Sequence, residues 1–178
     1  KNLRLVNMKI NDQGQTDSSG FVYLMRHNSK VTNISVQDSS SQLSGTSGFF
    51  GHQAAGGLIS GRMYDNTRIK QIAVVNSTIT YTGPTTNYVH IGSITCKTQD
   101  ADVRIVETYT DSSVVATQGP HGKVREDVGV MNSNADLVRS YYNDEGSQEG
   151  GRSTPVAQTS DMQGSTAKTT MNSLDFDS

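Results

Sequence analysis

The chain has 178 residues, a formal net charge of -2 at pH 7 and a hydrophobic fraction of 33%. The length suits one domain, and the nearly balanced charge gives no electrostatic reason to bind nucleic acid or an anionic membrane surface. No apolar run approaches the roughly 18 residues of a membrane-spanning helix, and the single cysteine, Cys96, excludes an intrachain disulfide framework.

A short phrase recurs five times in the first 145 residues. Its form is apolar-x-x-apolar-x-apolar, followed by Asn or Asp and often by Ser. The copies are Leu5–Asp12, Val31–Asp38, Ile69–Ser77, Val103–Ser112 and Leu137–Asp144, with spacings of 26, 38, 34 and 34 between their starts. Internal repetition of this length indicates a repeat architecture in which each unit packs on its neighbours.

A second apolar phrase precedes each later copy, and a polar turn separates the two. In chain order these phrases are Gly20–Arg26, Gly57–Met63, Val89–Ile94 and Val128–Met131. A third short apolar segment follows three of the main copies, at Ser41–Leu43, Thr78–Tyr81 and Val114–Thr117. All of these segments alternate with period two, are rich in β-branched residues and are bounded by Asn, Asp, Gly and Ser, so they predict strands.

The repeat length and the absence of helical periodicity predict an all-β fold. A propeller blade needs four strands in about 40 residues, whereas a parallel β-solenoid needs only one coil per repeat. We therefore expect a parallel β-solenoid of four to five coils over residues 1–145, with strands about 4.8 Å apart. Its core is a narrow column of like residues, such as Ile34 on Ile72 and Val36 on Val74.

The C-terminal segment, residues 146–178, differs in composition from the repeats. It is rich in Ser, Thr, Gly, Gln and Asp, with scattered apolar residues. Such a segment buries little apolar area against the entropy of ordering it. We expect a polar tail or linker, or alternatively an extended arm that orders against a neighbouring surface.

The phrase Gly57–Met63, followed by Ile69–Val74, resembles the GLUG-motif repeat, with its pattern Gly-Leu-apolar-Gly, a short turn and a strand. The resemblance extends over roughly residues 1–145. The copies at Val89–Ile94 and Val128–Met131 lack the Gly-Leu pair, and Ser60 precedes the second Gly. The family occurs in large surface proteins, including adhesins, and in non-catalytic regions of immunoglobulin A-cleaving metallopeptidases. The resemblance implies surface display and no catalysis.

The residues that could carry chemistry form no recognisable site in the sequence. The histidines His27, His52, His90 and His121 lack metal-ligand spacing, and His27 and His121 are expected in turns or loops. Cys96 is expected to be a small structural residue at the end of a strand. The pairs Asp100 with Asp102 and Asp144 with Glu145 lack the spacing of a calcium loop. No catalytic residue, metal ligand or cofactor is therefore predicted.

Two sequons make Asn33 and Asn76 candidate N-glycosylation sites. Polysaccharide cleavage is the enzyme class to weigh against a structural role, and Arg104, Glu107 and Asp111 share one repeat. Strict alternation along a strand places these three side chains on mixed faces. A glycan-binding face would need exposed aromatic residues, for which the candidates are Tyr23, Tyr64, Tyr81, Tyr88, Tyr109, Tyr141 and Tyr142.

A short solenoid leaves strand edges unpaired at both ends, and these edges can be covered by further coils or by another copy. The sequence therefore predicts a non-catalytic structural segment of an extracellular or cell-surface protein: a stalk, an adhesive passenger or a filament subunit. The expected partners are other copies stacked end to end or neighbouring coils of a longer chain. The alternatives are a module that binds a glycan or a host protein and, last, a polysaccharide-active enzyme. Neither nucleic-acid binding nor membrane insertion is expected.

Overall fold

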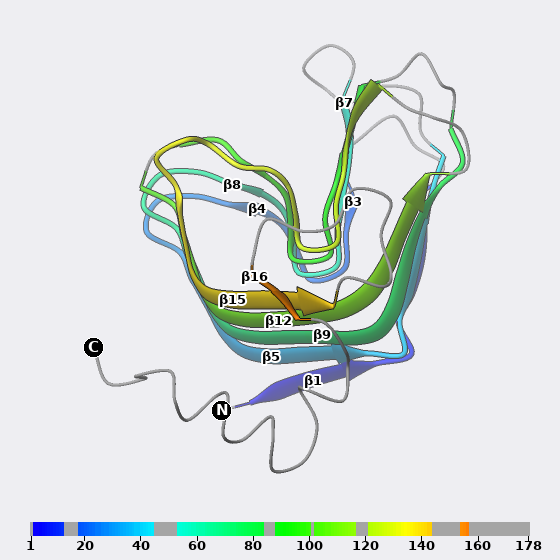
Figure 1. The fold of residues 1–178 in the computed structure, drawn as a ribbon, viewed down its shortest axis with the longest axis horizontal. Helices are drawn as coiled ribbons and strands as arrows, with labels where there is room; N and C mark the ends of the chain where they lie inside the picture. Colours follow the sequence, from blue (N-terminus) through cyan, green and yellow to red (C-terminus); the bar gives the residue numbers. More distant parts are fainter. Residues whose placement is uncertain are drawn as a thin grey trace.

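The computed structural model describes residues 2–12, 18–44, 53–83, 88–100, 102–116, 121–143 and 154–156. In these ranges every regular element is a β-strand, and all strand pairs are parallel. The strands stack level on level into a β-solenoid (Figure 1). The predicted fold class is confirmed.

Three sheets form the walls of the solenoid. The largest contains, in spatial order, β1 (Leu3–Val6), β5 (Lys30–Gln37), β9 (Arg68–Tyr81), β12 (Arg104–Ala116), β15 (Asp136–Asn143) and β16 (Thr154–Val156), with β2 (Lys9–Asp12) and β6 (Ser40–Leu43) beside them. The second contains β3 (Ser18–Ser19), β7 (Gln53–Gly57), β10 (Tyr88–Ile91) and β13 (His121–Val124). The third contains β4 (Val22–Met25), β8 (Ser60–Met63), β11 (Thr95–Thr98) and β14 (Val128–Val130).

The chain passes through the three sheets in turn, so each passage makes one coil. Three full turns separate β3 from β13, and β1 and β15 add a level of the largest sheet at either end. The predicted third segments join the main strands: Thr78–Tyr81 continues β9, and Val114–Ala116 continues β12. The second coil keeps this segment as a separate strand, β6, and the first coil has a separate strand at the same place, β2.

Three strands of the second sheet, β3, β7 and β13, lie outside the segments predicted as strands, apart from Gly57 at the end of β7. The strand β7 reads Gln-Ala-Ala-Gly-Gly, and β3 is only two residues long, so neither shows alternation or β-branched residues. The expectation that His121 lies in a loop is wrong, because it is the first residue of β13 and pairs with Tyr88. Pairing on the neighbouring coil, and not local propensity, makes these segments strands.

Left-handed backbone explains the spacing within the repeated phrase. Asn33, Gln71, Glu107 and Arg139 occupy equivalent places in β5, β9, β12 and β15, and all have φ between 49° and 58°. An alternating strand that contains one such residue places its inward side chains three residues apart at that point. This is why two positions, and not one, separate Val31 from Ile34 and Ile69 from Ile72.

A second left-handed corner in the largest sheet makes part of the predicted register wrong. Asn7, Asp38 and Asn76 have φ of 56°, 51° and 48°, which the short polar side chains of Asn and Asp tolerate. The apolar spacing around Asn7 therefore mimics that around Asn33. Leu5 pairs with Val36 and not with Val31, and Ile105, not Val103, pairs with Ile69. The true spacings, taken from Leu3 through Ile34, Ile72, Thr108 and Ser140, are 31, 38, 36 and 32 residues.

A sharp corner joins the second sheet to the third, and it lies within the predicted segments Gly57–Met63 and Val89–Ile94. Gly57 ends β7, and Leu58 and Ile59, both fully buried, turn the chain into β8. Gly92 occupies the equivalent corner of the next coil, where a Cβ would lie 2.5 Å from the carbonyl oxygen of Asp127. The corner therefore requires glycine because neighbouring backbones approach too closely for a side chain.

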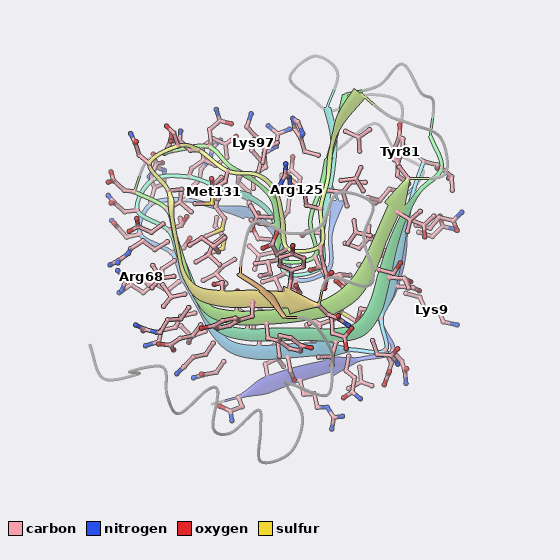
Figure 2. The ribbon with its side chains drawn as sticks, viewed as in Figure 1. Lys9, Arg68, Tyr81, Lys97, Arg125 and Met131 are labelled. Atoms are coloured by element: carbon pink, nitrogen blue, oxygen red, sulfur yellow. The ribbon has the colours of Figure 1, made fainter. Side chains whose placement is uncertain are left out.

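The core is the narrow column that the sequence predicts. Ile34 stacks on Ile72, and Val36 stacks on Val74, with each of these residues buried. Figure 2 shows the side chains of Lys9, Arg68 and Lys97 directed away from the coils. At the C-terminal end, Thr154–Val156 adds the strand β16 beside Tyr141–Asn143, within the segment predicted to be a tail.

Candidate interaction surfaces

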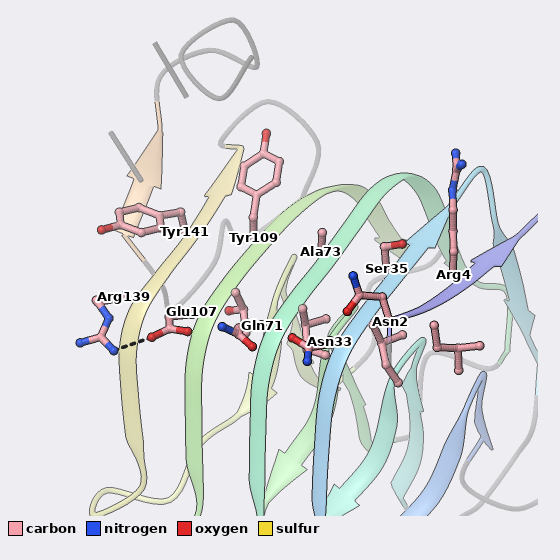
Figure 3. Close-up of a pocket in the computed structure, with 14 residues that line it drawn as sticks. Asn2, Arg4, Asn33, Ser35, Gln71, Ala73, Glu107, Tyr109, Arg139 and Tyr141 are labelled. Atoms are coloured by element: carbon pink, nitrogen blue, oxygen red, sulfur yellow. Dashed lines mark hydrogen bonds and ion pairs between the residues drawn. The ribbon is translucent and has the colours of Figure 1, made fainter. Parts of the chain in front are cut away.

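A groove of about 640 Å³ crosses the outer face of the largest sheet, perpendicular to its strands. Two rows of side chains border it (Figure 3). Because the strands are parallel and in register, equivalent side chains follow one another along the solenoid axis at about 4.8 Å. The groove is lined by Asn2, Leu3, Arg4, Asn33, Ile34, Ser35, Gln71, Ile72, Ala73, Glu107, Thr108, Tyr109, Arg139 and Tyr141.

The first row consists of the left-handed residues Asn33, Gln71, Glu107 and Arg139. Each strand thus contributes one long or amide-bearing polar side chain to the groove. Arg139 Nη2 donates to Glu107 Oε1 at 2.6 Å, and Lys70 Nζ lies 3.5 Å from Glu107 Oε2. The Glu107 side chain is only 3% exposed, and the two cations compensate its buried negative charge.

The second row consists of Ser35, Ala73, Tyr109 and Tyr141. The two tyrosines are register partners on β12 and β15, and the small side chains of Ser35 and Ala73 continue the row on β5 and β9. Burial raises the pKa of Tyr109 to about 12, with further contributions from the negative charges of Asp111 and Glu126. Its hydroxyl has no hydrogen-bond partner among the described residues.

The other aromatic candidates do not join this groove. Tyr81 is fully buried, Tyr142 is 7% exposed, and Tyr64 stacks under the Arg26 guanidinium at 4.8 Å from its ring centroid. Tyr23 lies at the N-terminal end of the solenoid, and nothing is described for the side chain of Tyr88. One signal in the sequence marks the groove: Glu107-Thr108-Tyr109 and Arg139-Ser140-Tyr141 share the order charged, hydroxyl, Tyr.

Among the described residues, the N-terminal end of the solenoid exposes apolar side chains beside strand edges that have no pairing strand. The strands β1, β3 and β4 are each the last strand on that side of their sheets. The exposed large hydrophobic residues of the described structure all belong to this first coil, namely Leu3, Val6, Phe21 and Tyr23. An exposed apolar edge of this kind is a template for pairing with another strand.

In the third sheet, the end strands and the inner strands differ in the polarity of two columns of side chains. One column runs Leu24, Arg62, Lys97 and Val130, and a second runs Val22, Ser60, Thr95 and Val128. In both columns the two end strands carry apolar residues, whereas the two inner strands carry polar ones. Lys97 of the first column points away from the coils (Figure 2). The end residues of that column, Leu24 and Val130, are partly exposed, whereas Val128 of the second column is fully buried.

A buried carboxyl lies at the C-terminal corner of the solenoid. Glu126 is fully buried, and its Oε1 accepts the Ser112 N–H at 3.1 Å. Burial raises the pKa of Glu126 to about 8. The charges of Asp111 and Asp127 act in the same direction, while hydrogen bonds from the Ser112 backbone and the Thr110 side chain oppose the shift. The buried hydroxyls of Thr108 and Ser112 have no hydrogen-bond partner in the described part of the chain.

The residues considered for catalysis remain apart. Arg104 pairs with Asp136 at 3.0 Å, Glu107 pairs with Arg139 and Lys70, and Asp111 accepts a hydrogen bond from Asn143. Asp100 accepts the Asp65 N–H at 3.0 Å, and Glu145 and Asp144 lie outside the described residues. Within the described ranges, no group of three or more His, Cys, Asp and Glu residues could hold a metal ion.

The structure confirms the prediction that His27 lies in a turn. It lies in a turn with its side chain 82% exposed, 3.5 Å from Asp65 Oδ2. His90 is buried in β10, and the side chains of His52 and His121 lie outside the described residues. Cys96 is buried and its thiol donates to the Gly61 carbonyl. It is the second residue of β11, not the end of a strand as predicted.

The two sequon asparagines occupy left-handed positions. Asn33 is half-buried and lines the groove, with φ of 57°. Asn76 is exposed at a corner, with φ of 48°, and its Nδ2 donates to Asp38 Oδ1. Glycosylation at either residue stays a prediction, as does the resemblance to the GLUG repeat.

The chain matches no protein-family model, no curated protein and no solved structure. None of the described segments is a helix long and apolar enough to span a membrane.

Proposed function

We propose that the chain is a non-catalytic structural segment of an extracellular or cell-surface protein, whose solenoid is extended by stacking at its ends. Its role would be that of a stalk, an adhesive passenger or a filament subunit. The single observation that carries the proposal is the apolar first coil, where Leu3, Val6, Phe21 and Tyr23 are exposed beside three open strand edges.

The third sheet supports stacking of the N-terminal end on the C-terminal end of another copy. Pairing β4 of one copy with β14 of the next would place Leu24 beside Val130 and Val22 beside Val128. It would also require β1 of the first copy to leave its level, because β15 of the next copy fills that level of the largest sheet. Both contacts would then be apolar and would continue a parallel ladder. Such a contact is heterologous, so repeated stacking yields a filament, and within a longer chain the same edges would pair with neighbouring coils. The cell-surface location is supported by the GLUG resemblance alone.

Static light scattering of the full chain tests the proposal. We expect the mass at tens of micromolar to exceed the 19.2 kDa of one chain and to rise with concentration. Leu24→Lys places a charge at the predicted contact and should return the mass to that of a single chain. Thr78→Lys is the matched control, because Thr78 is an exposed residue of β9, an inner strand of the largest sheet. A wild-type chain that stays monomeric throughout, or a Leu24→Lys variant that associates like the control, would contradict the proposal.

A further inference from the structure

The groove on the outer face of the largest sheet is built for a ligand that lies along the solenoid axis. It crosses β1, β5, β9, β12 and β15, so its contacts repeat once per strand. Four strand steps at about 4.8 Å give it a length of roughly 19 Å. A linear polymer can use such equally spaced contacts, whereas a compact small molecule would reach only one or two levels.

The polar row supplies groups that suit hydroxyls. The amides of Asn33 and Gln71 each offer a donor and an acceptor, and Gln71 is exposed. The adjoining Glu107 carboxylate is held by Arg139 and Lys70, so its position is fixed and its charge is compensated. The Arg139 side chain lines the groove and is 19% exposed, so its guanidinium is accessible to a ligand. A neutral ligand rich in hydroxyls can satisfy these groups without adding an uncompensated charge.

The aromatic row supplies an apolar contact beside them. Tyr141 and Tyr109 lie next to each other on β15 and β12, and the side chains of Ser35 and Ala73 are too small to fill the same row on β5 and β9. Figure 3 shows the two tyrosine side chains on the groove side of their strands. The C–H faces of a sugar ring pack on tyrosine rings, while the sugar hydroxyls require polar partners at the edge.

We propose that this groove binds a linear, uncharged glycan. The sugar rings pack on Tyr141 and against the edge of Tyr109, and the hydroxyls hydrogen-bond to the side chains of Gln71, Asn33 and Arg139. The chain of sugars runs along the axis from the tyrosine end towards Ser35. This site lies on the outer wall of the coils and meets the proposed stacking contact only at β1, where Leu3 lines the groove and also belongs to the exposed first coil.

Isothermal titration of the full chain with linear neutral oligosaccharides provides the test. The probes are the hexasaccharides of β-1,4-glucose, β-1,3-glucose and β-1,4-xylose, together with their disaccharides and with polygalacturonate as an anionic comparison. We expect at least one hexasaccharide to bind more tightly than its disaccharide. Tyr141→Ala should weaken that binding by about tenfold, as removal of a central aromatic contact does, and Gln71→Asn by about threefold, through loss of one hydrogen bond.

Tyr64→Ala is the matched control, since Tyr64 is a half-buried tyrosine that does not line the groove. Its affinity should stay within a factor of two of the wild type. Circular dichroism and the unfolding midpoint verify that each variant is folded. The proposal would be overturned by the absence of hexasaccharide binding at millimolar concentration. Binding that the Tyr141 and Tyr64 substitutions weaken equally, or binding of polygalacturonate alone, would also contradict it.

Discussion

The two ends of the solenoid are built differently inside. In β5 and β9 the core columns are apolar, with Ile34 on Ile72 and Val36 on Val74. In β12 the same columns continue as Thr108 and Thr110, and Glu126 and Asp127 are buried at the nearby corner. The first coil nevertheless leaves its apolar residues uncovered, whereas the last coil carries β16 on its largest sheet.

This difference separates two ways in which a repeat array can end. A polar interior loses little when it stops near water, because its hydroxyls and carboxyls can be hydrated. An apolar interior that stops without a cap leaves hydrophobic surface and unpaired backbone in contact with solvent. The N-terminal end therefore has more to gain from stacking than the C-terminal end. The chain is directional, which favours head-to-tail contact over symmetric pairing.

The largest expected effect comes from removing apolar volume in the N-terminal half of the core. Ile72→Ala should lower the free energy of unfolding by about 2–5 kcal/mol, since Ile72 is 3% exposed and packed in its column. Thr108→Val, one level further along the same column, should change it by less than about 1 kcal/mol or raise it, because the Thr108 hydroxyl is buried without a partner among the described residues. Urea unfolding of both variants measures the two changes in the free energy of unfolding. Equal losses of stability would contradict the difference between the apolar N-terminal core and the more polar C-terminal core.

The next effect concerns the buried carboxyl of the C-terminal half. The folded state raises the pKa of Glu126 from 4.5 to about 8, so between these values the folded chain retains a proton that the unfolded chain releases. Stability should therefore fall as the pH rises from about 5 to 8, by at most about 1.4 kcal/mol per pH unit. Below that window the carboxyl is protonated in both states and contributes no slope.

Glu126→Gln should remove this slope, because the amide oxygen can still accept the Ser112 N–H and carries no charge at any pH. The matched control is Asp102→Asn, which replaces an exposed carboxyl and should leave the slope in place. Urea midpoints measured at pH 5, 6, 7 and 8 provide the comparison. A Gln variant with the wild-type pH dependence would show that Glu126 is not the titrating group.

The smallest effect is expected at the left-handed row. Gln71 has φ of 58°, which costs a non-glycine residue free energy that glycine does not lose. Gln71→Gly should raise the free energy of unfolding by about 0.5–1 kcal/mol. Thr32→Gly, at an exposed position of β5 with ordinary strand backbone, should lower it instead. If both substitutions destabilise the chain equally, the left-handed row carries no strain.

The sequence predicts the solenoid because its inward positions must repeat in every coil. It does not predict the register around Asn7, because two different left-handed corners produce the same apolar spacing. Local sequence patterns also do not predict β7. The segment Gln53–Gly57 has little strand propensity, and it forms a strand because it pairs with β3 and β10 in the sheet. Alternation, spacing and turns are local properties, whereas register and pairing are set by stacking.

The two surfaces depend on information of the same non-local kind. Tyr109 and Tyr141 are 32 residues apart in the chain, and only the register of β12 on β15 makes them neighbours. Likewise, Leu24 and Val130 become comparable only when Arg62 and Lys97 are known to lie between them. In the sequence alone, nothing distinguishes the apolar residues at the two ends, and only the alignment of the columns shows that they occupy equivalent positions.

Disulfide cross-linking tests the head-to-tail account most directly. Leu24→Cys and Val130→Cys in one chain place thiols three strand steps apart, about 14 Å, which is too far for a bond within a copy. Stacked copies would bring Leu24→Cys of one chain beside Val130→Cys of the next. We expect the double variant to form a ladder of multimers on oxidation, and either single variant to stop at dimers or below. A double variant that gives no species larger than a dimer would contradict the account.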